Sequence, residues 1–207
     1  MATLNTSHIN NIERYYKYHS RIYDATRWAF LFGRKLLLSE LPDLPVNPRI
    51  LEVGCGTGKN IEILEYLFPD AKIFGIDLST DMLEIARIKA AKTNRIKLIN
   101  SRYGSNELEL KPFDLVLLSY SLTMTGSSTE SVLQRVLEDL KPDGKIAVVD
   151  FHNSPFQWFR RWMGRNHVNM NGQLLPLLNK YFTAEDISIS KAYLGLWQYF
   201  TFIGRPS

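Results

Sequence analysis

Short apolar runs alternate with amphipathic helical patterns along most of the chain, beginning at Arg49. Apolar or β-branched runs predict buried strands, and apolar positions spaced three or four apart predict helices. The expected strands are Arg49–Val53, Lys72–Asp77, Arg95–Asn100, Phe113–Ser121 and Lys145–Phe151. The helices expected between them are one running through Phe68, one over Ser79–Lys92 with Ser79 as N-cap, and one from Ser131 that Pro142 and Gly144 end. Strands that alternate with helices in this way predict parallel crossovers and a doubly wound α/β sheet.

The two ends of the chain differ from this alternating part. Ile187–Tyr193 and Trp197–Gly204 have no helix between them, so they predict a hairpin that ends the sheet with one antiparallel strand. Leu41–Pro48 contains three prolines and predicts a stiff linker. We therefore expect an N-terminal helical cap and linker over residues 1–48 and a main domain over 49–207. An insertion near 155–180 is expected to form a lid. Together, the five strands of the alternating part and the two strands of the hairpin predict a Rossmann-like, seven-stranded, mostly parallel sheet.

Composition narrows the class without choosing a function. The 207 residues are 45% hydrophobic, which suits one globular domain. No apolar run reaches the roughly 20 residues that span a bilayer, and the first residues lack a signal-peptide core, so we expect a cytoplasmic protein. Cys55 is the only cysteine, which excludes an intrachain disulfide and a thiolate metal cluster, and we expect no metal. The net charge of +4 is compatible with an anionic surface and diagnostic of none.

The sharpest motif is "ILEVGCGTGKN", in which three glycines directly follow a predicted strand. Gly54, Gly56 and Gly58 would present bare amides at a helix N-terminus, where a ligand can lie against the backbone. A phosphate-binding P-loop is excluded, because Asn60 follows Gly58-Lys59 where Ser or Thr is required. A dinucleotide fingerprint is also excluded, because Lys59 stands where its third glycine belongs.

Two carboxylates near the glycine loop narrow the choice of ligand. Asp77 ends the second predicted strand, 21 positions after Gly56, where an acid accepts hydrogen bonds from ribose hydroxyls. Glu52, just before the loop, would repel a pyrophosphate and suit a cation. The combination predicts an adenosine without phosphates that carries positive charge, which is S-adenosylmethionine.

The motifs "LEVGCGTG", "GIDLSTDML", "FDLVLLSYSL" and "LKPDGKIAVVD" resemble those of class I S-adenosylmethionine-dependent methyltransferases, in the usual order. The resemblance implies that the glycine loop passes the methionine moiety, that Glu52 faces its amino group and that Asp77 holds the ribose. The adenine would lie among Leu78, Met82, Asn100 and Ser101. Ser119 to Ser121, at the carboxyl end of the fourth strand, would face the reaction centre. S-adenosylhomocysteine would be the product.

Aromatic and basic residues are mixed in two further segments. One is Arg14–Lys35 and the other is Pro155–Arg165. Such mixtures suit the headgroup zone of an anionic bilayer, so a peripheral position on the inner membrane face is expected. Ordinary packing of an N-terminal cap is the preferred explanation of the individual aromatics, and the segment as a whole could do both. Nucleic acid is not expected as a partner, because the chain has no long basic run and no tetrapeptide like that of base methylators.

The ends also carry a more specific resemblance. "HSRIYDATRWAFLFGR", "NHVNMNGQLLPLLNKYF" and "YLGLWQYFTFIGR" are similar to bacterial betaine-lipid N-methyltransferases. This resemblance implies that the acceptor is the amine of diacylglyceryl-homoserine, which becomes the trimethylated betaine lipid. Bacterial phosphatidylethanolamine N-methyltransferases share a cousin pattern and are the first alternative. A quinone-precursor or small-molecule methyltransferase and a non-catalytic S-adenosylmethionine-binding protein are the others.

An amine acceptor needs a neutral nitrogen in line with the methyl group and stabilisation of the cation that forms. Tyr23 and Tyr120 are the candidates for stabilising that cation. His19 and His152 are candidate bases, His152 because it follows the fifth strand at its carboxyl end. Guanidinium groups pair with carboxylates in bidentate fashion, so the candidates for a homoserine carboxylate are Arg27, Arg161 and Arg165.

Overall fold

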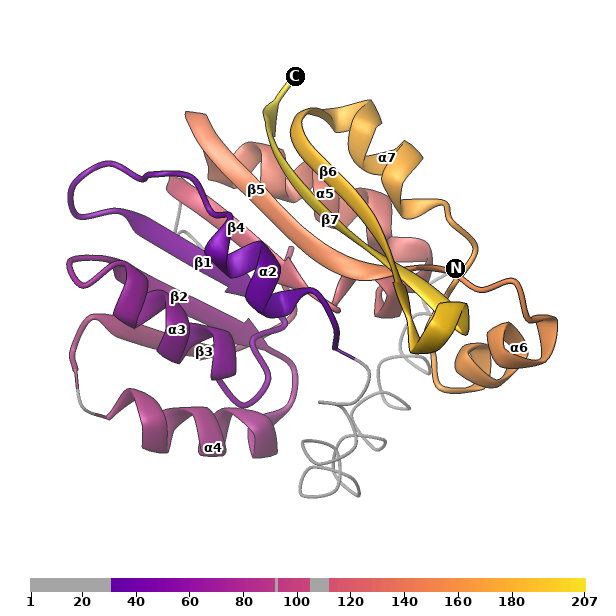
Figure 1. The fold of residues 1–207 in the computed structure, drawn as a ribbon. Helices are drawn as coiled ribbons and strands as arrows, with labels where there is room; N and C mark the ends of the chain where they lie inside the picture. The colour runs from indigo at the N-terminus through magenta and orange to yellow at the C-terminus, as the bar shows by residue number, and fades with distance from the viewer. Residues whose placement is uncertain (1–30, 92, 105–111) are drawn as a thin grey trace, which may run out of the picture.

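A computed structural model describes residues 31–91, 93–104 and 112–207. Its centre is one seven-stranded sheet in the order β3-β2-β1-β4-β5-β7-β6 (Figure 1). The strands are β1 Arg49–Val53, β2 Lys72–Asp77, β3 Ile96–Asn100, β4 Phe113–Ser119, β5 Leu140–Asn153, β6 Phe182–Ala192 and β7 Trp197–Pro206. β7 is antiparallel to both of its neighbours, and β1 to β5 pair in parallel. The predicted fold class is confirmed.

Helices cover both faces of the sheet, as a doubly wound sheet requires. The helices are α2 Arg34–Ser39, α3 Lys59–Leu67, α4 Thr80–Ala90, α5 Thr129–Asp139, α6 Gln157–Arg165 and α7 Leu174–Tyr181, with short 3₁₀ turns η1 Leu122–Met124, η2 Gly126–Ser128 and η3 Tyr193–Gly195. One core contains Leu37 of α2 and Leu64 of α3, and the other contains Leu133 of α5 and Leu178 of α7. The two cores lie on opposite faces of the strands. In the part of the chain that the structure describes, no helix is both long and apolar enough to cross a bilayer.

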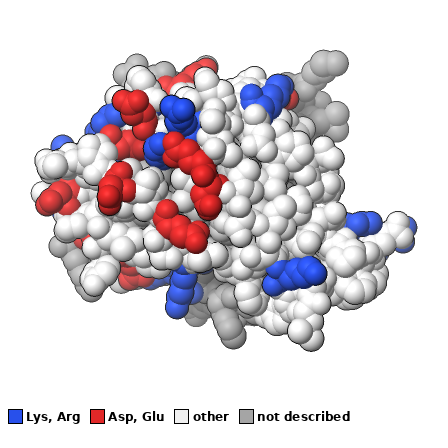
Figure 2. Space-filling view, turned by 45° about the horizontal axis from the view of Figure 1, so that its top comes forward, with Lys and Arg blue, Asp and Glu red and all other residues white. Residues whose placement is uncertain are grey.

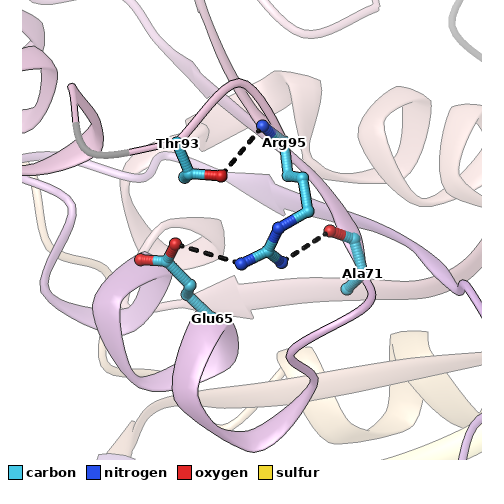
Figure 3. Close-up of polar contacts among 4 residues, drawn as sticks. All are labelled: Glu65, Ala71, Thr93 and Arg95. Atoms are coloured by element: carbon cyan, nitrogen blue, oxygen red, sulfur yellow. Dashed lines mark hydrogen bonds and ion pairs between the residues drawn. The ribbon is translucent and has the colours of Figure 1, made fainter.

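The amino-terminal edge of this sheet is held by a polar cluster as well as by apolar packing. Arg95, just before β3, donates from its guanidinium to the Ala71 carbonyl (3.3 Å) and to Glu65 of α3 (3.3 Å). Its backbone amide donates to Thr93 Oγ1 at 3.2 Å. Figure 3 shows the Arg95 side chain extended between α3 and the turn before β2. The contact places α3 against the end of the sheet opposite to the glycine loop.

Several element boundaries differ from the prediction. The helix expected to continue to Pro142 ends at Asp139, because Leu140 is already extended (φ −76°, ψ 149°) and the residue before a proline also disfavours helix. Pro142 and Gly144 lie inside β5, where the pairing register with β4 shifts. β4 ends at Ser119, two residues early, since Tyr120 takes a left-handed φ of 55°. The antiparallel strand is also not at the edge: β7 lies between β5 and β6.

Two local predictions hold. Ser79 caps α4, and its Oγ accepts a hydrogen bond from the Met82 amide at 3.3 Å. The segment between α2 and β1 has no regular structure, as three prolines predict. Most of the expected N-terminal cap, including Tyr23, His19 and Arg27, lies outside the described residues.

Candidate functional site

The glycine loop leaves the carboxyl end of β1 in a left-handed conformation. Gly54, Gly56 and Gly58 have φ values of 74°, 52° and 76°, a region that other residues avoid. A Cβ on Gly54 would lie 2.8 Å from Ser121 Cβ, whereas a Cβ on Gly56 would meet nothing within 4 Å. Gly54 is therefore required by close packing between β1 and β4. Gly56 keeps space open above the loop, and that space is where a ligand would lie.

Asp77 joins the loop to the next helix. Its Oδ2 accepts the Gly56 amide at 2.8 Å, and its Oδ1 accepts the Ser79 amide at 2.9 Å. The carboxylate thus lies beside the loop at the end of β2, as the sequence spacing predicts. In this structure it orders the loop and the start of α4, and the ribose contact stays a prediction.

Glu52 is the most unusual group of the site, because it is a carboxyl with only 1% of its surface exposed. Its Oε1 accepts from Asn60 Nδ2 at 2.6 Å, whereas its Oε2 is buried without a hydrogen-bond partner. Burial raises the pKa of Glu52 to about 8, while the Asn60 hydrogen bond and the Arg34 guanidinium act in the opposite direction. A cation placed beside Oε2 would favour the ionised form. This fits a ligand that carries an ammonium group.

The loop and Glu52 open into one cleft. Its walls are Leu31, Arg34, Glu52, Gly54, Cys55, Gly56, Thr57, Lys59, Asn60, Met82 and Ser119. The glycine loop and Glu52 are therefore on the walls of one space, where a ligand would contact both.

The structure brings most of the predicted cofactor residues to this end of the sheet. Met82 and Ser119 line the cleft, and Gly58 is the N-cap residue of α3. The side-chain amide of Asn100 donates to the backbone carbonyls of Asp77 (3.1 Å) and Leu78 (2.9 Å). The Ser101 amide donates to the same Asp77 carbonyl at 3.2 Å. Asn100 and Ser101 therefore fix the turn after β2, and the adenine contact expected from either stays a prediction.

Sequence reasoning missed two polar side chains of the cleft that are linked to Glu52. Asn60 donates to Glu52 Oε1, and Arg34 donates from Nε to Asn60 Oδ1 at 3.1 Å. Ser121, which was predicted to face the reaction centre, lies against Gly54, and its Oγ is buried without a hydrogen-bond partner. A signal was present for Asn60, which lies in the first turn of the helix that follows the loop. Nothing local pointed to Arg34, which reaches the cleft only through tertiary packing.

Tyr120 has a different role from the predicted one. Its ring is 1% exposed and packs edge-on against Phe151, with 4.7 Å between the ring centroids. Its hydroxyl donates to the Phe32 carbonyl at 2.6 Å. The hydroxyl is therefore engaged with the backbone before α2, and the prediction that Tyr120 meets the acceptor is corrected. Tyr120 acts here as a positioning residue for the segment that carries Leu31 and Arg34.

Among the described residues, the predicted acceptor residues Arg161, Arg165 and His152 do not line the glycine-loop cleft. Arg161 lines a separate cavity of about 520 Å³ together with Arg160 and His167. Arg165 is exposed and lines neither cavity. His152 is half-buried at the carboxyl end of β5, its Nδ1 is buried without a hydrogen-bond partner, and burial lowers its pKa.

Asp150, which sequence reasoning also missed, is buried next to this second cavity. It accepts from the amide (3.1 Å) and the Oγ1 (2.6 Å) of Thr123, and Thr123 lines the cavity. Burial raises the pKa of Asp150 to about 6 against these hydrogen bonds. The carboxylate fixes η1, the turn that follows β4.

An apolar groove lies close to the cleft. It has a volume of about 420 Å³ and is lined by Trp158, Phe159, Trp162, Tyr193, Leu196 and Trp197. Phe32 packs against Tyr193 and Trp197, with ring centroids 5.2 and 5.9 Å apart. Leu31, the preceding residue, lines the glycine-loop cleft. One short segment therefore borders both the polar cleft and the apolar groove.

Comparison with known proteins agrees with this geometry. Residues 50–144 match the family model described as methyltransferase domain. The chain is 29% identical over 148 residues to a malonyl-[acyl-carrier protein] O-methyltransferase of Priestia megaterium, covering 70% of this chain and 53% of that protein. It is 29% identical to a demethylmenaquinone methyltransferase of Lactococcus lactis, covering 64% and 52%. The chain thus spans about half the length of these curated relatives.

The fold has solved counterparts. One is the Burkholderia thailandensis 1,6-didemethyltoxoflavin-N1-methyltransferase, solved with 1,6-didemethyltoxoflavin and S-adenosylhomocysteine. It superposes with a TM-score of 0.73 at 17% identity, covering 100% of this chain and 91% of that one. At this identity the similarity establishes the fold.

Proposed function

We propose that this chain is an S-adenosylmethionine-dependent methyltransferase that acts on the amine of a lipid headgroup, with diacylglyceryl-homoserine as the acceptor. The observation that carries the first half is a buried carboxyl with an unpartnered oxygen, Glu52, beside a glycine loop that leaves space above Gly56. The match of residues 50–144 to the methyltransferase domain supports the same assignment. The observation that carries the second half is the apolar groove next to this cleft.

The residues of the cleft suit this cofactor. When bound, S-adenosylmethionine supplies an electrophilic methyl group on a sulfonium. Glu52 would hold its amino group, and the bare backbone at Gly54 and Gly56 would allow close approach of its methionine moiety. Asp77 would accept from the ribose, with Leu78 and Met82 beside the adenine. Ser119, on the wall of the cleft, would face the reacting end.

The acceptor assignment combines the groove with the resemblance of the chain ends to betaine-lipid enzymes. The groove has no polar lining residue and accommodates an apolar chain. A headgroup attached to that chain would then lie near Leu31 and Phe32, at the edge of the cleft. We propose that α6, inside the expected lid over 155–180, forms the far wall of this acceptor site.

Transfer to an amine needs the nitrogen to lose a proton first. His152 suits this task chemically, because its lowered pKa keeps the imidazole neutral at pH 7. Arg161 and Arg165 are not assigned to the homoserine carboxylate, because Arg161 lines a cavity separate from the groove and Arg165 lines neither space. His19, Tyr23 and Arg27 lie outside the described residues and are proposed on the resemblance alone.

A quinone precursor is the competing acceptor, because the groove is apolar and one relative is a demethylmenaquinone methyltransferase. Phosphatidylethanolamine would differ from the homoserine lipid in carrying a phosphate and no carboxylate. A site built for one headgroup should discriminate against the other, because an unpaired buried charge costs binding energy.

The test offers purified protein and labelled S-adenosylmethionine three acceptors in matched mixed micelles: diacylglyceryl-homoserine, phosphatidylethanolamine and a demethylated quinone. We expect label first in the homoserine lipid, with mono-, di- and trimethylated products separated by thin-layer chromatography. Faster labelling of either other acceptor would transfer the assignment to it. Calorimetric binding of S-adenosylhomocysteine without any labelled product would indicate a binding protein rather than an enzyme.

A further inference from the structure

Two segments far apart in sequence form one exposed apolar surface. Trp158 and Trp162 of α6 are 62% and 45% exposed, and Tyr193 and Leu194 of η3 are 51% and 109% exposed. These four residues are called the aromatic face below. Figure 1 shows α6 beside the turn between β6 and β7, at the same end of the molecule. Trp158, Trp162 and Tyr193 also line the same groove, so the two segments are in contact with one space.

The turn that carries Leu194 is strained. Tyr193 and Leu194 have φ values of 46° and 57°, a left-handed conformation that costs non-glycine residues free energy. The Leu194 side chain is fully exposed (109%), so no described residue covers it. The free-energy cost of a strained turn that exposes a leucine is offset when that leucine is buried in an apolar environment outside the chain.

The residues of helix α6 lie on three stripes of different character. Phe159 and Met163 are buried and hold the helix on the core. Trp158 and Trp162, four positions apart, lie on a second stripe, and the exposed Arg161 and Arg165 lie on a third. The helix thus presents an apolar stripe and a basic stripe to its surroundings.

Charge around the aromatic face has one sign. The sequence has no acidic residue from Phe151 to Ala184. Arg161, Arg165 and the exposed Lys191 belong to no ion pair within residues 31–91, 93–104 and 112–207. Figure 2 shows acidic residues gathered on one side of the molecule, and a broad uncharged area with scattered basic residues on the other.

We propose that the aromatic face docks on an anionic bilayer. Leu194 and the two tryptophans enter the zone below the headgroups, and Arg161, Arg165 and Lys191 contact lipid phosphates. Docking in this orientation turns the mouth of the apolar groove toward the membrane, where a lipid acceptor enters it. This inference rests on the proposed lipid acceptor for its purpose, but the docking itself requires neither cofactor nor methyl transfer.

Sedimentation of the full chain with vesicles tests the proposal without cofactor. Vesicles of phosphatidylcholine alone and of phosphatidylcholine with phosphatidylglycerol contain no amine acceptor. We expect binding to the anionic vesicles that weakens as salt rises, because exposed charges are screened within about 10 Å at 0.1 M salt. Leu194→Ser should weaken binding about tenfold, the value of one buried leucine, and Leu194→Phe should restore it.

Ile88→Ser is the matched control, because Ile88 is an exposed aliphatic residue (76%) on α4, away from the aromatic face. It should bind like the wild type. The double variant Arg161→Glu/Arg165→Glu should lose the preference for anionic vesicles.

Wild-type binding by Leu194→Ser, or equal binding to both vesicle types, would overturn the proposal. A change of sedimentation mass in Leu194→Ser without vesicles would also overturn it, since the face would then join two copies of the chain. Vesicle binding without labelling of any lipid amine would refute the proposed function and leave the docking proposal standing. Labelling of a lipid amine in micelles without vesicle binding would refute the docking proposal and leave the proposed function standing.

Discussion

The glycine-loop cleft and the apolar groove lie on either side of Leu31–Phe32 but are built in opposite ways. The cleft is lined by directed polar contacts, such as Asp77 to the Gly56 amide and Asn60 to Glu52. The groove is lined by aromatic rings, of which Phe159 and Trp197 stack at 12° with centroids 5.5 Å apart. Hydrogen bonds select a ligand by geometry, whereas apolar surface stabilises in proportion to area and tolerates variation. The difference suits one invariant cofactor and an acceptor with variable chains.

Substitutions should therefore act differently in the two regions. Single atoms matter in the cleft, because its polar groups are held by directed hydrogen bonds and Glu52 Oε2 is left open for a ligand. Removal of one ring from the groove should change affinity gradually. Four variants test the cleft side of this contrast.

The largest effect is expected from Gly56→Val. No protein atom lies within 4 Å of the added Cβ, so the side chain fills ligand space. We expect calorimetry to detect no binding of S-adenosylhomocysteine. Gly104→Val is the matched control, because Gly104 also has a left-handed φ (88°) and open space but does not line the cleft. If Gly104→Val loses binding equally, backbone strain rather than occupied space is the cause.

Asp77→Ala should weaken cofactor binding by roughly 1.5–3 kcal/mol, the scale of hydrogen bonds to a charged group. The structure adds a second cost, because the amides of Gly56 and Ser79 lose their acceptor. Calorimetry with S-adenosylhomocysteine measures the sum, and Asp70→Ala, on the exposed turn before β2, serves as control. Normal affinity of Asp77→Ala would refute both the ribose contact and the loop-ordering role.

Glu52→Gln should weaken cofactor binding and raise the stability of the folded protein at high pH. The folded-state pKa of about 8 lies above the ordinary carboxyl value of 4.5, so the unfolded chain releases this proton at lower pH than the folded protein does. The contribution of Glu52 to stability is therefore greatest below about pH 4.5 and is lost as the pH rises toward 8. Glu52→Gln should gain about 1–3 kcal/mol over wild type at pH 8.5 and much less at pH 5.

Thermal unfolding at both pH values measures this gain, and calorimetry should show weakened cofactor binding in the same variant. Glu84→Gln, exposed on α4, should follow the wild-type pH profile. A Glu52→Gln protein that is less stable than wild type at pH 8.5 would contradict the assigned burial cost.

The smallest effect is expected from Tyr120→Phe, which keeps the buried ring and removes the hydrogen bond to the Phe32 carbonyl. Urea unfolding should show a loss of about 0.5–1.5 kcal/mol. Tyr103→Phe is a matched comparison, because Tyr103 donates its buried hydroxyl to Asp139 at 2.9 Å away from the cleft. Methyl-transfer rates that collapse in Tyr120→Phe while its stability stays close to that of Tyr103→Phe would return a catalytic role to this hydroxyl.

The sequence by itself determined the parts that depend on short-range order. Alternating apolar runs and helical spacings predicted the strands of the parallel sheet, and Ser79 was identified as a cap because its contact spans three residues. Gly54, Gly56 and Asp77 meet at one edge because parallel strands all end there. These features depend on periodicity, on left-handed glycine φ values and on strand polarity, which a linear chain already carries.

Only the tertiary structure decided the destinations of side chains that leave the strand ends. Tyr120 was expected at the reaction centre, but its left-handed φ of 55° turns the hydroxyl to Phe32, 88 positions away. Arg161 lines a different cavity from Glu52, and Arg34 lines the cleft although no sequence pattern predicted it. The groove joins α6 to the β6–β7 turn, which no local pattern connects. Such contacts depend on how segments distant in sequence pack together, and a local pattern of residues does not encode that packing.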